Sequence, residues 1–259
     1  MLIPRVMPCL LLKEESLVKT VKFQNPGYIG DSINAVRIYN EKEVDELIFL
    51  DITATLEKRK PPFKILAEIA GECFMPVAYG GGIRTLDDIK TIFSLGIEKV
   101  ALNSYAVENP RFVQEAADAF GSQSIVASID ARRHAPGRYE VYTQGGRKPS
   151  GLDPVQHALH VQRMGAGEIL LTSIDRDGTQ EGYDLELIRS VARNVSIPVI
   201  ACGGAGKVQD FVDAIIEGGA SACAAGSMVV YFGRNRAVLI SFPSRRELEQ
   251  VLGKEEGIT

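Results

Sequence analysis

The chain has 259 residues, of which 45% are hydrophobic and 24% are charged, and its 29 basic and 33 acidic side chains give a formal net charge of −4. This composition is typical of a globular protein with one large core or two small ones. The weakly acidic balance argues against a nucleic-acid partner, and no apolar run approaches the roughly 18 residues of a membrane-spanning helix.

Short apolar runs alternate with longer amphipathic stretches along the whole chain. The runs predict eight strands, at residues 3–12, 46–51, 76–79, 99–102, 124–130, 168–172, 198–201 and 220–225. The stretches predict helices at residues 86–95, 110–120, 154–164, 185–194, 208–217 and 247–252. Strands without polar alternation, separated by helices, indicate a parallel sheet covered by helices. Eight such units fit one α/β domain over residues 1–259, a (β/α)8 TIM barrel, and a doubly wound open sheet is the alternative.

Two connections are longer than the others. Residues 13–30 are predicted as a loop after the first strand, and residues 132–151 as a loop after the fifth, with a β-like segment at 139–143. Loops of this length in a compact domain are usually functional.

The two halves of the chain resemble each other. The segment that contains Gly81 and Gly82 recurs around Gly203 and Gly204, and the strand that ends at Asp51 has a counterpart that ends at Asp175. The offset is close to half the chain in each case. This repeat favours a closed barrel built from two half-barrels over an open sheet.

Each glycine cluster follows a predicted strand and precedes a helix. Glycine lets backbone N–H groups approach an anion, and a helix N-terminus adds a favourable dipole. We therefore expect two phosphate pockets at one mouth of the barrel, although the glycines could serve only as tight turns. The residues expected to form these pockets are Gly81, Gly82, Asn103 and Ser104 in the first half, and Gly178, Gly203, Gly204, Gly226 and Ser227 in the second.

Four aspartates end strands at the same mouth: Asp51, Asp130, Asp175 and Asp177. Carboxylates at this place can do acid–base work or hold substrate hydroxyls. Each could instead cap a helix or a turn. Asp130 leads into the long loop after the fifth strand, which favours a functional role there.

Four charged residues stand at the opposite ends of otherwise apolar strands: Arg5, Glu46, Lys99 and Glu168. Arg5 shares its strand face with Met7, Cys9 and Leu11, so that all four point inward if one does. The charges could neutralise one another as a ring at the barrel floor, or each could point to solvent.

No metal or cofactor is indicated. His157 and His160 lack a third ligand nearby, and Cys9, Cys73, Cys202 and Cys223 lie far apart in apolar segments without a CxxC pair. The first residues lack the order of a signal peptide, and we expect a protein of the reducing cytoplasm.

Several short motifs follow one another along the chain. They are LDITA at 50–54, GGGIR at 80–84, NS at 103–104, ENP at 108–110, FGSQ at 120–123 and GEILLTSIDRDGT at 167–179. With these motifs in this order, the chain resembles HisF, the cyclase subunit of imidazole glycerol phosphate synthase, over roughly residues 1–232. The resemblance implies a barrel that receives ammonia from a HisH-type glutaminase. Arg5, Glu46, Lys99 and Glu168 match the charged gate of the family. At the mouth, the family joins ammonia to a bisphosphorylated nucleotide, which yields imidazole glycerol phosphate and an aminoimidazole carboxamide ribotide.

One position departs from the family. The cyclase uses an aspartate at the end of the first strand and another at the end of the fifth. Asp130 matches the second and Lys19 is retained, but Leu11 stands where the family has the first. A missing general acid or base costs about 10²–10⁴-fold in rate. A glycine also stands near residue 145 where the family offers a serine hydroxyl.

A subgroup shares this pattern. CLLLK at 9–13, VKTVKF at 18–23 and ACAAGS at 222–227 resemble HisF-like proteins of acetamidino-sugar biosynthesis, in pathways that build lipopolysaccharide O-antigen. There the barrel is expected to pass ammonia to a separate sugar amidotransferase. A working cyclase, a scaffold that only activates its glutaminase, and a sugar-phosphate isomerase of the HisA type are the alternatives.

Overall fold

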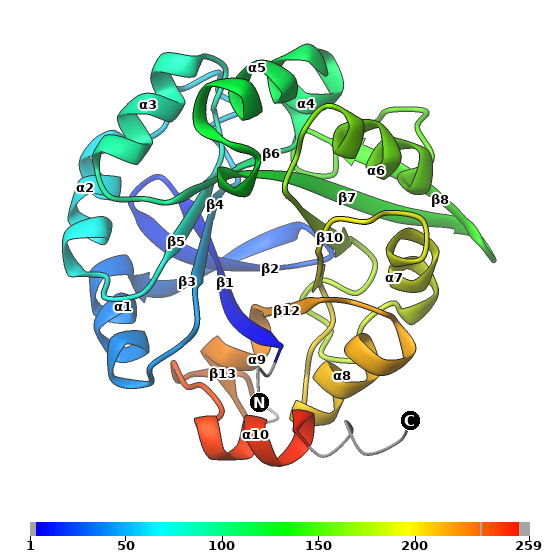
Figure 1. Cartoon of the computed structure of the whole chain (residues 1–259). Helices are drawn as coiled ribbons and strands as arrows, with labels where there is room; N and C mark the ends of the chain where they lie inside the picture. Colours follow the sequence, from blue (N-terminus) through cyan, green and yellow to red (C-terminus); the bar gives the residue numbers. More distant parts are fainter. Residues whose placement is uncertain (1–3, 234, 254–259) are drawn as a thin grey trace.

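Eight parallel strands close into a barrel, and helices surround it (Figure 1). The computed structural model describes residues 4–233 and 235–253. The barrel follows the chain order from β1 to β12, with β12 paired to β1 and β7 paired to β10 in parallel register. These pairings confirm the predicted (β/α)8 barrel and exclude the open sheet. The barrel strands are β1 (Arg5–Lys13), β4 (Leu47–Asp51), β5 (Val77–Gly80), β6 (Lys99–Leu102), β7 (Ile125–Ala135), β10 (Glu168–Ser173), β11 (Val199–Cys202) and β12 (Ala222–Ala225).

The helices lie outside the strands, and those predicted at 86–95, 110–120, 154–164, 185–194 and 247–252 form within a few residues of the predicted bounds. The helices are α1 (Ser32–Glu41), α2 (Phe63–Glu72), α3 (Leu86–Ser94), α4 (Ser104–Glu108), α5 (Arg111–Phe120), α6 (Pro154–Arg163), α7 (Leu185–Ala192), α8 (Val208–Val212), α9 (Ser227–Val230) and α10 (Arg245–Leu252). A 3-10 turn, η1 (Ser122–Ser124), precedes β7. The predicted helix at 208–217 forms in two parts, because α8 continues into a wider π-helical turn, η2 (Asp213–Glu217), in which Gly218 N–H donates to the Asp213 carbonyl.

Side-chain alternation along the strands separates two cores. The outer faces pack against the helices in a large cluster that includes Phe49, Tyr79 and Ile129. The inner faces fill the barrel with a smaller cluster that includes Met7 and Leu170. Because every barrel strand contributes to both cores, the strands are apolar on both faces, as the continuous apolar runs predicted.

The two long connections are hairpins and not irregular loops. After β1, the chain forms β2 (Ser16–Val21) and β3 (Gln24–Asp31), and β2 pairs antiparallel with the end of β1. The prediction of a loop at 13–30 was therefore wrong: Leu17 and Val18 are buried, and Lys22 and Phe23 make the turn with positive φ. Within 132–151, β7 extends into a hairpin with β8 (Arg138–Thr143), in agreement with the predicted β-like segment, and β9 (Lys148–Pro149) follows.

A short hairpin, β13 (Tyr231–Phe232) with β14 (Ala237–Val238), follows α9. Within the described part of the chain, no helix is long and apolar enough to cross a membrane.

Candidate functional site

The carboxyl ends of the barrel strands and the loops after them enclose a cavity of about 240 Å³. Parallel strands bring their carboxyl ends to one edge, which is why residues far apart in the sequence meet here. Most predicted site residues line this cavity: Lys19, Asp51, Gly81, Gly82, Asn103, Ser104, Asp130, Asp177, Gly178, Gly203, Gly204, Gly226 and Ser227.

Asp130 lies on the inward face of β7. One of its carboxylate oxygens, Oδ2, accepts a hydrogen bond from Asn103 Nδ2 at 3.0 Å. Burial and the nearby Asp177 charge raise the pKa of Asp130 to about 7, against the opposing effect of hydrogen bonds from Thr172 and Asn103. A carboxyl group with this pKa exchanges protons readily at neutral pH, as a general acid or base requires.

The raised pKa of Asp130 predicts a pH-dependent effect on stability. The unfolded chain has the ordinary value of 3.8, so the native state favours the protonated form. The protonated carboxyl group therefore stabilises the native state relative to the unfolded chain. This contribution is complete below pH 3.8 and is lost as the pH rises through about 7. We expect Asp130→Asn to unfold with a free energy higher than wild type by about 1–3 kcal/mol at pH 8, with no such gain at pH 4. Urea unfolding at both pH values measures this difference, and equal gains at both would contradict it.

Leu11 lies on the inward face of β1, near the end of the strand, and lines the same cavity as Asp130. Its side chain is nearly buried, and it lies in register with Leu50 of β4 and Val18 of β2. An isobutyl group at this place can neither donate nor accept a proton. Of the pair of acids expected at the mouth, only Asp130 is present.

Lys19 and Asp177 form a buried ion pair beside the cavity. Lys19 Nζ donates to Asp177 Oδ1 at 2.8 Å, and Thr20 Oγ1 donates to Asp177 Oδ2 at 2.9 Å. Burial lowers the pKa of Lys19, but the Asp177 carboxylate outweighs it and holds the pKa above the ordinary value. The ammonium group is therefore charged, and Asp177 fastens β2 to the loop after β10.

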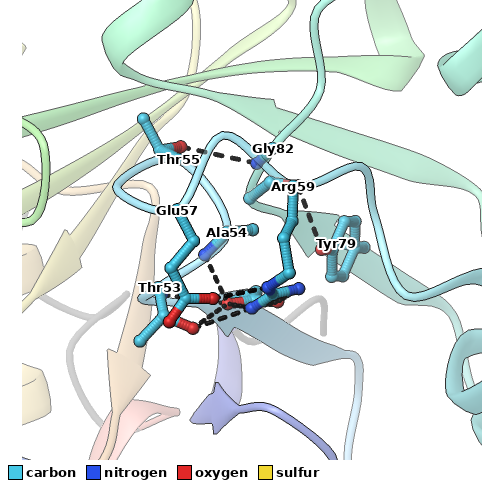
Figure 2. A network of polar contacts seen from close by, with 9 residues as sticks. Thr53, Ala54, Thr55, Glu57, Arg59, Tyr79 and Gly82 are labelled. Atoms are coloured by element: carbon cyan, nitrogen blue, oxygen red, sulfur yellow. Dashed lines mark hydrogen bonds and ion pairs between the residues drawn. The ribbon is translucent and has the colours of Figure 1, made fainter.

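The Asp51 carboxylate is not free to hold a substrate, although we expected that role. Its side chain is completely enclosed, and Oδ1 accepts hydrogen bonds from the Thr53 and Ala54 N–H groups at 2.9 Å each. Arg59 approaches the same carboxylate at 3.4 Å and donates to Thr53 Oγ1 at 2.8 Å. Figure 2 shows the loop that these contacts hold together, with Arg59 against Thr53 and Glu57. Asp51 thus shapes the loop after β4, which is the capping role that the sequence left open.

Asp175 does not line the cavity, so its expected substrate role is not supported. Its Oδ2 accepts a hydrogen bond from the backbone N–H of Arg133 at 2.8 Å. The carboxylate therefore anchors the β7–β8 hairpin to the loop after β10.

In the first glycine pocket, several of the groups that could bind an anion already form hydrogen bonds within the protein. Gly82 N–H donates to Thr55 Oγ1 at 3.4 Å, the contact at the top of Figure 2. Ser104 Oγ accepts from Gln144 N–H at 2.9 Å and donates to Asn103 Oδ1 at 3.3 Å. An anion here would have to share these donors.

The second glycine pocket needs glycine for close packing. Gly203 has φ +87°, and a Cβ there would come within 2.7 Å of the Ser173 carbonyl oxygen. Gly178 has φ +75°, and its Cβ would meet the Thr20 carbonyl oxygen at 2.3 Å. Larger residues would displace the backbone that surrounds the cavity at this point.

The four charged residues at the other end of the strands form a closed ring. Arg5 contacts Glu46 at 2.6 Å and also pairs with Glu168. Lys99 Nζ lies 3.0 Å from Glu46 and 2.8 Å from Glu168. Each cation therefore bridges both carboxylates, and the four charges neutralise one another, with the carboxylates buried and the cations partly exposed. Of the two arrangements that the sequence left open, the structure shows the ring.

One apolar layer separates this ring from the cavity. Along β10 the inward residues are Glu168, Leu170 and Thr172. Along β6 they are Lys99 and Ala101, and Asn103 follows directly after the strand. Thr172 and Ser128, which carry hydroxyl groups, also line the cavity. Sequence reasoning missed these two hydroxyls, although each shares its strand face with a predicted site residue.

Comparisons with known proteins agree on a family. The family model described as "Histidine biosynthesis protein" matches residues 5–235. A Pseudomonas aeruginosa protein, provisionally named imidazole glycerol phosphate synthase subunit hisF2, is 51% identical over 245 residues, which are 95% of this chain and 98% of that protein. An Alkaliphilus metalliredigens protein named imidazole glycerol phosphate synthase subunit HisF is 48% identical over 231 residues, 89% of this chain and 92% of its own length.

Proposed function

The chain belongs to the HisF family of histidine biosynthesis proteins, and we propose that it receives ammonia from a HisH-type glutaminase at its charged ring and releases it at the opposite mouth without closing an imidazole ring. The observation that carries this proposal is Leu11, an apolar side chain that lines the cavity at the position where the resemblance to HisF implies an acid. The ammonia would serve to form an acetamidino group on a surface-polysaccharide sugar, through a separate amidotransferase.

The charged ring supports the entry step. Lys99 and Arg5 pair with the carboxylates of the ring at the amino ends of the barrel strands. A hydrated ion that approaches this end of the barrel therefore meets a closed set of ion pairs and not an open pore. Rearrangement of one cation would open a path along the barrel axis. Each charge of the ring loses part of its hydration, so the ring carries a desolvation penalty that its ion pairs must offset. Its place at the end of the barrel axis suits a gate for a small molecule.

The inner core supports passage of the neutral form. The layer above the ring contains Ala78, Ala101 and Ala222, whose small side chains leave more room than the neighbouring Leu170 and Ile200. An apolar layer disfavours ammonium strongly and neutral ammonia far less. Beyond this layer, Ser128 and Thr172 offer hydrogen bonds on the way to Asp130.

A cyclase of histidine biosynthesis is the second candidate, and the names of the relatives favour it. In that case Asp130 would act as the single acid or base on the bisphosphorylated nucleotide. The retained Asp130, Lys19 and glycine pockets are consistent with such a substrate. The two candidates therefore differ in the acceptor of the ammonia and in whether ring closure proceeds without an acid at position 11.

One assay separates these candidates. Purified chain, ammonium chloride and the bisphosphorylated nucleotide are incubated, and imidazole glycerol phosphate is measured. We expect a rate at the uncatalysed background, equal to that of Asp130→Asn. A rate well above background that Asp130→Asn abolishes would replace our proposal by the cyclase.

A further inference from the structure

The β13–β14 hairpin brings an arginine to the second glycine pocket. Arg236 lies immediately before β14, and its guanidinium group reaches back to the loops that line the cavity. Its Nη2 donates to the Gly178 carbonyl oxygen at 3.1 Å and to Ser227 Oγ at 3.3 Å. Both partners line the cavity. The guanidinium also lies 4.7 Å from the centre of the Tyr231 ring, which supports it from the hairpin side.

Arg236 has no carboxylate partner within ion-pair distance among residues 4–233 and 235–253. Other arginines around the barrel rim are paired: Arg133 contacts Asp184 at 3.1 Å, and Arg84 lies 3.9 Å from Glu108. Among the described residues, one guanidinium nitrogen of Arg236 donates hydrogen bonds, and both acceptors are neutral oxygens. A guanidinium has five N–H donors in a fixed fork, so most remain available for an anion.

The backbone at Arg236 adds a second observation. Its φ is +50°, in the left-handed region that side chains other than glycine rarely adopt. The Arg236 N–H donates to the Gly233 carbonyl at 3.1 Å and closes the turn that sets this conformation. The hairpin thus holds the guanidinium against Gly178 and Ser227, two residues that line the cavity, at a conformational cost.

We propose that Arg236 is the side-chain cation of the second pocket and binds the phosphate group of a phosphomonoester ligand. The inference rests on the proposed function only in taking the cavity as the site of a phosphorylated small molecule. The fork of Arg236 would bind two phosphate oxygens, and Ser227 Oγ would donate to a third. Lys19 cannot supply this charge, because its ammonium is neutralised by Asp177. Arg236 therefore gives the second pocket a preference for the dianion of a phosphomonoester.

Calorimetric titration with inorganic phosphate, and separately with glycerol 3-phosphate, tests this proposal. We expect Arg236→Ala to raise Kd for both by about tenfold or more, and Arg236→Lys to raise it less, since the lysine keeps the charge but not the fork. The matched control is Arg245→Ala, on the exposed side of α10, which should stay within about twofold of wild type. In a Ser227→Ala background, the Arg236→Ala effect should shrink, because both side chains would hold the same anion.

Circular dichroism and thermal unfolding without phosphate establish that each variant is folded. Unchanged phosphate binding in folded Arg236→Ala would overturn the inference, as would no phosphate binding by the wild-type chain. Ammonia transfer from glutamine is measured apart from these titrations and needs no added phosphate. Its failure would refute the proposed function, whereas the titrations decide on Arg236 alone.

Discussion

Replacement of Leu11 by aspartate is expected to raise the rate of imidazole glycerol phosphate formation by about 10²–10⁴-fold over the wild-type background. The reason is that the second acid, the lysine and the glycine pockets expected of a cyclase site are in place. Asp130 has a pKa of about 7, Lys19 is charged, and the glycine pockets line the same cavity as position 11. The measurement is product formation from the bisphosphorylated nucleotide with ammonium as nitrogen donor.

The control for this variant is Leu11→Asn, which has the same shape as the aspartate but no titratable group. It should stay at background if proton transfer is the missing element. Both variants place a polar group against Leu50 and Val18, so each should lose about 1–3 kcal/mol of unfolding free energy. Equal loss in the two variants leaves the comparison valid. Equal activity of aspartate and asparagine would show that position 11 does not act as an acid or base here.

Lys99→Met is expected to uncouple glutamine hydrolysis from ammonia transfer. Removal of the ammonium leaves Glu46 and Glu168 with Arg5 alone, so the ring acquires a net negative charge that binds ammonium and no longer guides the neutral amine. With the glutaminase bound, we expect the yield of transferred nitrogen per glutamine to fall about tenfold or more, while free ammonia appears in solution. Breaking a buried ion-pair network should also cost about 3–5 kcal/mol of stability.

A lysine on the outer surface provides the control for the ring. Lys90 on α3 is exposed, so that Lys90→Met should change neither coupling nor stability by a measurable amount. Transfer supplied with external ammonium should be unaffected in both variants, because that ammonia can enter from the mouth. If Lys99→Met transfers glutamine nitrogen as efficiently as wild type, the chain acts as a scaffold that activates its glutaminase and not as a conduit.

The barrel and the ring could be predicted from the sequence, because both follow from the alternation of side chains along single strands. Arg5, Met7, Cys9 and Leu11 share one face of β1, and the structure places them in the ring, the inner core and the cavity as that shared face predicted. Lys99 and Glu168 could be placed by the same rule. Once a strand is recognised, the position of a residue in the sequence indicates which face of the strand it occupies and how near it lies to either end of the barrel.

The roles of the loop residues were harder to predict from the sequence, because their contacts depend on partners far away along the chain. The sequence predicted Asp51, Asp130 and Asp175 alike as aspartates at the carboxyl ends of strands. In the structure Asp51 accepts hydrogen bonds from its own loop, and Asp175 accepts one from Arg133. Which carboxylate remains available to a ligand is decided by neighbouring N–H groups that the local sequence does not identify. Arg236 was missed for the same reason.

The central claim is that the barrel carries ammonia but does not close the imidazole ring. Its most direct test supplies [amide-15N]glutamine and the glutaminase to the wild-type chain, with both possible acceptors present: the nucleotide-linked N-acetyl sugar with its amidotransferase, and the bisphosphorylated nucleotide. Mass spectrometry then locates the label. We predict 15N in the acetamidino group and none above background in imidazole glycerol phosphate, and label that accumulates in imidazole glycerol phosphate would contradict the claim.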